Sequence, residues 1–195
     1  MATSSAITPT KRRRTSAFQR LMSVHWWMAG IYPALWGVGL LMVKLDRENP
    51  VRSPLYDFHK SLGIVTLMLL TWRIITLLQV WWRKYAKRWP RFSLPWLKLV
   101  ALHSLLYGFM VGVPLSGFYL SNSFKSQNVR FFGLVMPDLF PENHAALGLA
   151  RSLHFWLSYV FLAFVILHMI DQWKVVKALW RRFQKWFQKR QQPAN

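Results

Sequence analysis

Four long apolar stretches dominate the pattern of hydrophobic and polar positions along the chain, at residues 20–43, 58–82, 99–121 and 148–172. Each supplies the roughly 20 apolar residues that a helix needs to cross the hydrocarbon core of a bilayer. The third stretch contains Pro114 and Gly117, which a membrane helix tolerates when neighbouring helices satisfy the freed backbone groups. The pattern predicts an all-α membrane protein, a four-transmembrane-helix bundle of up-and-down topology.

Lys and Arg residues between these stretches predict the orientation of the bundle. Residues 11–20 contain five of them, residues 83–98 contain six and residues 174–190 contain seven, whereas the connections 44–57 and 122–147 contain three and two. Basic connections stay on the cytoplasmic side of a membrane. Both termini and the middle connection are therefore expected to be cytoplasmic.

The same pattern sets three domain boundaries. Residues 1–17 are expected to form a disordered basic N-terminal tail, residues 18–175 the transmembrane domain, and residues 176–195 a basic cytoplasmic C-terminal tail. A cleaved signal peptide fits poorly, because the uncharged segment 21–43 is too long for one and lacks a small-residue cleavage site.

Composition narrows the function classes. The 195 residues are 53% hydrophobic and carry 26 Lys plus Arg against 6 Asp plus Glu, a net charge of +20. The basic clusters are separated by long uncharged runs, which favours contact with a lipid bilayer and no nucleic acid. The chain has no Cys, which excludes disulfides, zinc–thiolate sites, iron–sulfur clusters and covalent haem attachment through a Cys-x-x-Cys-His motif.

The run LHFWLSYVFLAFVILH, residues 153–168, places two histidines inside a membrane span. Ionisable side chains in the bilayer are costly and mark functional sites. At a rise of about 1.5 Å and a turn of about 100° per residue, His154 and His168 lie about 21 Å apart on nearly the same helix face. One helix therefore presents two imidazoles at two depths of the bilayer.

The expected topology sorts the intramembrane histidines into an outer group, His59 and His154, and an inner group, His25, His103 and His168. Two stacked bis-histidine haem sites explain five histidines on four helices. Paired imidazoles leave no open iron position, which favours electron transfer. The alternatives are polar core residues hydrogen-bonded across helices, a proton relay, or a zinc or copper site, which would need three or four ligands at one depth.

Two further residues belong to the inner level. Arg73 lies fourteen residues after His59, where it would either pair with a haem propionate or extend its side chain to the cytoplasmic interface. His103 is an axial ligand, a group that hydrogen-bonds a propionate or quinone, or a packing residue. His168 could therefore pair with either His25 or His103.

Five segments, taken in order, resemble the bacterial cytochrome b561 family, which includes the membrane superoxide oxidase and the cytochrome b subunits of nickel hydrogenases. They cover almost the whole chain after the N-terminal tail. The segments are FQRLMSVHWW (18–27), DFHKSLGI with TWRI (57–64 and 71–74), LHSLLYGFMVGVPLSG (102–117), FFGLVMP (131–137) and LHFWLSYVFLAFVILH (153–168).

The resemblance implies a dihaem cytochrome b domain over residues 18–175, in the bacterial inner membrane. It implies that His25 and His168 bind the inner haem b and that His59 and His154 bind the outer one. The propionate or quinone region is then expected to involve four further residues, Arg73, His103, Arg20 and Lys98. No catalytic residue beyond the haems is expected.

Two functions from different classes follow. The first is a quinone-linked oxidoreductase that passes electrons from a small periplasmic donor, such as superoxide, to ubiquinone in the respiratory chain. The second is a non-catalytic electron-conducting subunit that anchors a dehydrogenase or hydrogenase. The protein partner would be either such a dehydrogenase subunit or a further copy of the chain, in a homo-oligomer. The weakest functional alternative is a basic membrane scaffold without a cofactor. The outer connections carry balanced charge, which does not favour an anionic donor.

Overall fold

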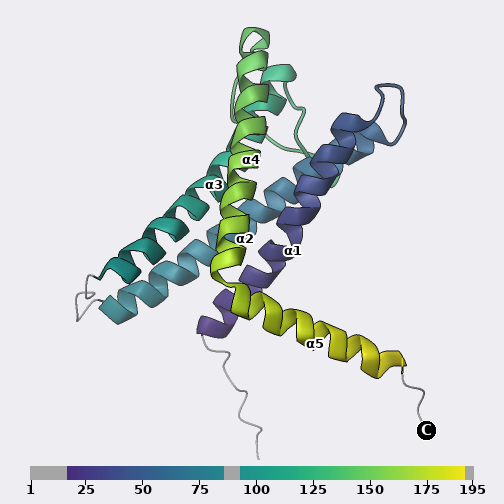
Figure 1. Ribbon diagram of the computed structural model, residues 1–195. Helices are drawn as coiled ribbons and strands as arrows, with labels where there is room; N and C mark the ends of the chain where they lie inside the picture. The colour runs from purple at the N-terminus through teal and green to yellow at the C-terminus, as the bar shows by residue number, and fades with distance from the viewer. Residues whose placement is uncertain (1–16, 86–92, 192–195) are drawn as a thin grey trace, which may run out of the picture.

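The computed structural model describes residues 17–85 and 93–191, and it is helical apart from one short hairpin (Figure 1). Within these residues, four helices are long and apolar enough to cross a membrane, which confirms the predicted four-helix fold class. The elements are α1 (Ala17–Lys44), α2 (Arg52–Tyr85), α3 (Leu94–Phe124), β1 (Arg130–Phe131), β2 (Leu134–Val135), the short 3₁₀ helix η1 (His144–Ala146), α4 (Leu147–Asp171) and α5 (Trp173–Gln191).

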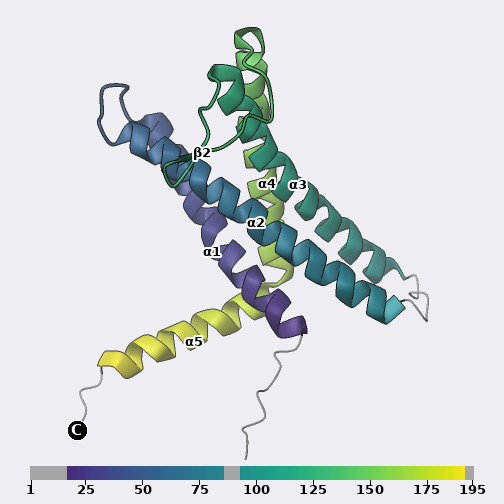
Figure 2. The same cartoon turned by 180° about the vertical axis from the view of Figure 1, so that it is seen from behind.

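The four long helices form two antiparallel pairs that cross each other. The most extensive contacts join α3 to α4 and α1 to α2, and α2 also contacts α3 (Figures 1 and 2). The start of α1 and the end of α4 lie at one end of the bundle, and the two loops 45–51 and 125–143 lie at the other. This arrangement is the predicted up-and-down topology, while the side of the membrane on which each end lies remains a prediction.

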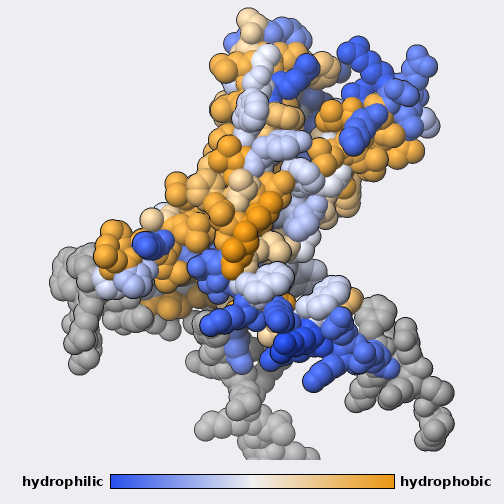
Figure 3. All heavy atoms as spheres, in the orientation of Figure 1, coloured by the Kyte–Doolittle hydropathy of each residue, from blue (hydrophilic) through white to orange (hydrophobic). Residues whose placement is uncertain are grey.

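Large apolar side chains cover the outside of the bundle. Trp72, Leu78 and Leu167, for example, are each more than half exposed, and hydrophobic residues form a broad zone over the middle of the molecule in Figure 3. Lipid tails are as apolar as these side chains, so a membrane bundle does not need to bury them.

The helices extend beyond the apolar stretches at several ends. α2 begins at Arg52 rather than at the expected residue 58, and α3 begins at Leu94 rather than at residue 99. The start of α3 is capped by Ser93, whose hydroxyl accepts a hydrogen bond from the N–H of Trp96 at 3.3 Å. Hydropathy locates the hydrocarbon core, whereas caps and turns determine where a helix ends.

The C-terminal segment is a helix, which sequence analysis did not predict. α4 ends at Asp171, and α5 begins two residues later and leaves the bundle in a new direction (Figures 1 and 2). The expected tail from residue 176 is therefore helical through Gln191. The expected N-terminal tail, residues 1–17, and the basic middle connection fall largely outside the described residues.

The loop between α3 and α4 folds back onto the N-terminal part of α2. Its β1–β2 hairpin turns at Phe132 and Gly133, both with positive φ, as the tight hairpin turns that match strand twist require. The hydroxyl of Ser61 on α2 donates to the carbonyl of Arg130 at 3.1 Å and accepts from the N–H of Phe132 at 2.9 Å. The hairpin is thus attached to α2 at the level of the outer histidines.

Candidate functional site

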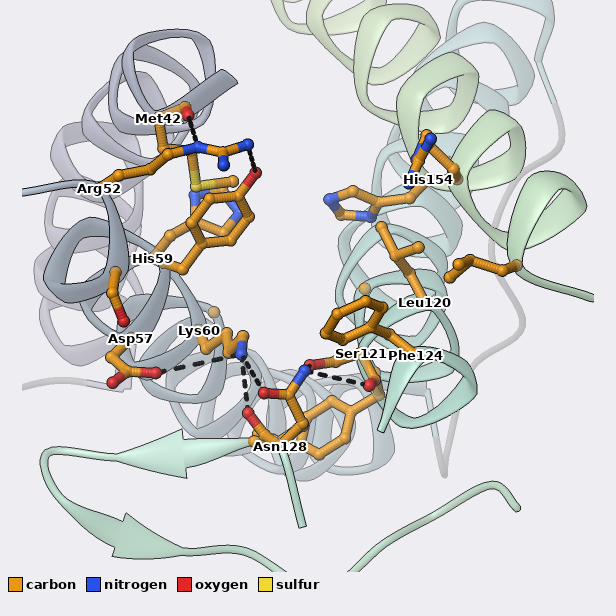
Figure 4. Close-up of a pocket in the computed structure, with 18 of the residues that line it drawn as sticks. Met42, Arg52, Asp57, His59, Lys60, Leu120, Ser121, Phe124, Asn128 and His154 are labelled. Carbon is orange, nitrogen blue, oxygen red and sulfur yellow. Dashed lines mark hydrogen bonds and ion pairs between the residues drawn. The ribbon is translucent and has the colours of Figure 1, made fainter. Parts of the chain in front are cut away.

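The outer pair consists of His59 on α2 and His154 on α4, which face each other from opposite walls of a pocket (Figure 4). Their ring centroids lie 6.3 Å apart, and their ring planes are at 90°. The two residues are 95 positions apart in the chain, and the crossing of the two helix pairs brings them together. The structure therefore places the two histidines of the outer group side by side.

Hydrogen bonds set the orientation of the His154 ring. Its Nδ1 lies 3.1 Å from the carbonyl of Val113 and 3.0 Å from the hydroxyl of Ser116, both on α3. A carbonyl can only accept, so Nδ1 carries the proton and Nε2 keeps its lone pair. This is the arrangement in which an imidazole binds a metal through Nε2 while a backbone group holds the other nitrogen.

Two glycines make room for the outer rings. A Cβ atom on Gly39 would lie 3.3 Å from Cε1 of His59, and one on Gly117 would lie 3.1 Å from Cε1 of His154. Carbon atoms pack best at about 3.5–4.0 Å. Any side chain at these two positions would therefore press on a histidine ring.

A cavity of about 810 Å³ surrounds the outer pair and opens between the two helix pairs. Its lining includes four Lys or Arg residues and two acidic ones. The basic residues are Arg47, Arg52, Lys60 and Arg151, and the acidic residues are Glu48 and Asp57. Lys60 donates to the backbone carbonyl of Asn128 at 2.7 Å and to its side-chain oxygen at 3.3 Å (Figure 4). The cavity wall is therefore net positive, although the outer connections as a whole are balanced.

The outer loop forms one side of this cavity. Asn128, which lines it, donates to the carbonyl and the hydroxyl of Ser121, both at 3.2 Å. Asp138 holds the loop by accepting from the N–H of Gln127 and from the side chain of the fully buried Asn122. The 125–143 loop is thus held in place by hydrogen bonds where it forms one wall of the pocket.

The inner level brings three histidines together. The rings of His25 on α1 and His168 on α4 lie 6.3 Å apart at 85°, and those of His103 on α3 and His168 lie 5.4 Å apart at 84°. Nδ1 of His168 is buried and has no hydrogen-bond partner within the part of the chain that the structure describes, whereas Nδ1 of His103 lies 2.8 Å from the carbonyl of Leu99. His168 is therefore the shared member of the inner group.

Arg73 points into the bundle beside these rings. Its Nε donates to the Tyr107 hydroxyl at 2.8 Å, its Nη1 donates to the carbonyl of Leu21 at 2.9 Å, and its guanidinium lies over the Tyr107 ring. Leu21 lies one helical turn before His25 on α1. The structure thus places Arg73 at the inner level, with its guanidinium turned inward.

Arg20, Lys98 and His144 do not belong to either histidine pair. Arg20 and Lys98 are exposed, so their part in a propionate or quinone region remains a prediction. His144 is exposed on the outer loop, where its Nε2 lies 3.1 Å from the Glu142 carboxylate. It does not join the outer pair.

An aromatic layer separates the two levels. The buried ring of Phe161 lies seven residues from both His154 and His168. It contacts Tyr32 of α1, with ring centroids 5.1 Å apart, and stacks on Phe109 of α3 at 6.3 Å. This layer contains no charged side chain and fills the centre of the bundle.

The 6.3 Å separation suits one metal ion held between two rings. A metal–nitrogen bond of about 2.0 Å on each side, plus about 1.1 Å from each nitrogen to its ring centre, gives about 6 Å. Within residues 17–85 and 93–191, no group of three or more His, Asp or Glu could hold an ion directly. Each pair thus fits an ion whose remaining ligands come from a cofactor, as in haem.

Sequence analysis missed several residues of the site. Lys60 lies next to His59 and was not singled out, and neither were Arg52 and Arg151. Ser116 and Gly39 matter only because a histidine from another helix lies against them. Arg151 could have been found from the sequence, because it is a basic residue one helical turn before an intramembrane histidine. Ser116 and Gly39 could not, because their contacts with histidines depend on how the helices pack.

Comparison with known proteins agrees with this geometry. The sequence profile of prokaryotic cytochrome b561 matches residues 14–170. The chain is also 27% identical over 150 residues to cytochrome b561 homolog 2 of Escherichia coli, an alignment that covers 74% of this chain and 76% of that protein. The chain therefore belongs to the prokaryotic cytochrome b561 family, membrane cytochromes that bind haem b and transfer electrons.

Proposed function

We propose that the protein binds two haem b groups and carries electrons from a small donor at the periplasmic side, such as superoxide, to ubiquinone in the bacterial inner membrane. The observation that carries this proposal is the 6.3 Å ring separation, which occurs once at each level of the bundle. When bound, the two haem groups supply one-electron transfer across the bilayer.

Each histidine pair would hold one haem through its ring nitrogens. His59 and His154 would bind the outer group, and His25 and His168 the inner group. Nε2 of His154 is suited to this role, because the carbonyl of Val113 accepts a hydrogen bond from the other ring nitrogen, Nδ1. Two histidine ligands to each iron would suit one-electron transfer rather than binding of the donor.

Basic residues would hold the propionates and attract the donor. Arg73 is the cationic partner at the inner level, and Lys60 and Arg52 line the outer cavity. An anion such as superoxide is drawn toward a net-positive cavity, since a field of opposite sign speeds encounter. Oxidation of two superoxide anions to dioxygen releases two electrons, which together with two protons reduce one ubiquinone to ubiquinol.

The testing experiment uses the purified full chain. A dithionite-reduced minus oxidised spectrum should give two haem b per chain. Enzymatically generated superoxide should then reduce the haem, and ubiquinone should reoxidise it. His59→Leu should abolish reduction by superoxide, while dithionite still reduces the haem that remains.

The outcomes separate the competing functions. A dihaem preparation that superoxide does not reduce would overturn the proposed donor. Purification with a large dehydrogenase or hydrogenase, together with reduction only through that partner, would establish the electron-conducting subunit instead. A colourless folded protein would remove both functions.

A further inference from the structure

From Trp173 to Trp186, helix α5 carries two chemically different faces. At about 100° per residue, the large apolar positions of this stretch fall within an arc of about 160°, and its basic positions fall on the opposite side. The apolar face contains Trp173, Val175, Val176, Leu179, Trp180, Phe183 and Trp186. The basic face contains Lys174, Lys177, Arg181, Arg182 and Lys185.

The apolar face is exposed in the folded chain. Trp173 and Trp180 are each 61% exposed, Phe183 is 52% exposed and Val175 is 46% exposed. The rings of Trp180, Phe183 and Trp186 form a stacked row along the helix, with centroids 6.0 and 6.4 Å apart. A continuous aromatic row of this size marks a surface that meets an apolar environment.

The position of α5 identifies that environment. α4 is a membrane span that ends at Asp171, and α5 begins at Trp173, so its first turn is held at the bilayer surface. α5 then leaves the axis of α4 and runs away from the bundle (Figures 1 and 2). A helix that starts at this depth and turns aside can place its apolar side in the acyl-chain boundary.

Charge indicates which lipid is recognised. From residue 173 to the end of the chain there are seven Lys or Arg and no Asp or Glu. Hydrophilic residues cover the part of α5 that faces the viewer in Figure 3. Basic residues beside a membrane surface bind anionic phospholipid headgroups.

A recess at the root of α5 offers one such headgroup a defined position. It has a volume of about 360 Å³ and lies between the indole of Trp26 on α1 and the start of α5. Lys174 and Arg182 supply two positive charges to it, and Val175 and Leu179 supply apolar contacts. Cationic groups beside aliphatic side chains suit a phosphate attached to an acyl chain.

We propose that α5 lies in the plane of the membrane, with its apolar face in the headgroup–acyl boundary and its basic face bound to anionic phospholipid. The distribution of Lys and Arg predicts that this is the cytoplasmic leaflet. The proposal does not depend on the haem ligands or on the electron donor.

The absence of Cys makes a site-specific test direct. Single cysteines at Val175 and Phe183, on the apolar face, and at Lys177 and Lys185, on the basic face, would each carry one spin label. The full chain is reconstituted in vesicles of phosphatidylcholine alone or of equal parts phosphatidylcholine and phosphatidylglycerol. Power saturation with oxygen and with a water-soluble nickel complex reports depth. A label at Val160, on the exposed surface of α4, gives the bilayer reference.

We expect the labels at Val175 and Phe183 to meet oxygen more than nickel, and those at Lys177 and Lys185 to show the reverse. The two apolar-face labels should lie deeper with phosphatidylglycerol than without it. Nickel access at all four sites would overturn the membrane position. Shielding of the apolar face from both reagents would overturn it in favour of a protein partner.

A charge variant tests the lipid specificity. The triple variant Lys177→Gln, Arg181→Gln, Lys185→Gln should reduce the depth at Val175 in the phosphatidylglycerol vesicles to its value in phosphatidylcholine alone. The matched control, Lys44→Gln, Lys125→Gln, Arg130→Gln, removes equal charge at the other end of the bundle and should leave the depth unchanged. Equal depth of the Val175 label in both kinds of vesicle, in the chain without these charge substitutions, would overturn anionic headgroup binding.

Discussion

The rings of His25 and His168 lie 6.3 Å apart, the same separation as the rings of His59 and His154 at the other level of the bundle. The rings of His103 and His168 lie only 5.4 Å apart. One metal ion between two imidazole nitrogens requires about 6 Å between ring centres. The geometry therefore favours His25 as the partner of His168, a choice that residue spacing alone left open.

Substitution of His103 should preserve both haems. Its Nδ1 lies beside the carbonyl of Leu99 on its own helix, and its ring is too close to His168 for an ion between them. His103→Leu is expected to retain two haem b per chain, whereas His25→Leu should retain one. A haem-to-protein ratio measures this, and one haem in His103→Leu with two in His25→Leu would reverse the assignment.

A methyl group at either glycine beside the outer rings should destabilise the protein. Gly117→Ala would place a Cβ 3.1 Å from Cε1 of His154, and we expect a loss of about 1–3 kcal/mol of stability from overpacking. The spectrum of the outer haem should change while that of the inner haem does not.

The same helix provides the control for this prediction. Gly112→Ala adds a methyl group with no atom within 4 Å, and Gly37→Ala is the equivalent control for Gly39→Ala on α1. Low-temperature electron paramagnetic resonance separates the two haem signals. Equal spectra for Gly117→Ala and Gly112→Ala would show that the close approach has no effect on the ring.

Arg73 should raise the midpoint potential of the inner haem. A nearby positive charge stabilises the reduced form, so Arg73→Gln is expected to lower the potential of that haem and leave the outer one unchanged. Loss of the hydrogen bonds to Tyr107 and Leu21 should also cost about 1.5–3 kcal/mol of stability. Tyr107→Phe should cost less, because it removes only one partner.

Potentiometric titration and thermal unfolding measure the two effects. Arg181→Gln, on the exposed surface of α5, removes the same charge far from the rings and serves as the control. A potential that falls equally in both variants would indicate a general effect of net charge.

The outer loop should open when Asp138 is removed. Its carboxylate accepts from the N–H of Gln127 at 3.0 Å and from the side chain of the buried Asn122. Asp138→Ala leaves both donors unpaired, and we expect faster hydrogen exchange in residues 125–143. Asp46→Ala, an exposed carboxylate in the other loop at this end, should leave that exchange unchanged. Unaltered exchange in both variants would mean that other contacts hold the loop.

Arg151 should speed encounter with an anionic donor. It lines the outer cavity, so Arg151→Gln is expected to lower the second-order rate of reduction by superoxide and to weaken its dependence on ionic strength. Arg130 is exposed at the same end and does not line the cavity, so Arg130→Gln is the matched control. Equal rates in the two variants would show that the cavity wall does not guide the donor.

Sequence alone predicted the helical bundle and the depth of each histidine. Backbone groups inside a bilayer must be hydrogen-bonded within the segment, so an apolar run of sufficient length can only be a helix. Helix periodicity then placed His154 and His168 on one face. The alternating topology grouped His154 with His59, and His168 with His25 and His103. The two faces of α5 are also visible in the sequence at helical spacing. Residues 176–195 were nevertheless predicted to be a basic tail, because their charge was considered without their helical periodicity.

The tertiary structure decided what depends on distances between helices. Its ring separations favour His25 over His103 as the partner of His168. It places Gly39 and Gly117 against histidine rings, and it places Asn128 of the outer loop in the cavity wall. A hydropathy pattern records the depth of a residue and the direction of its side chain from one helix axis. It does not record how the helices pack against one another. The difference of about 1 Å between the His25–His168 and His103–His168 ring separations arises from that packing, and it determines which two imidazoles can share one ion.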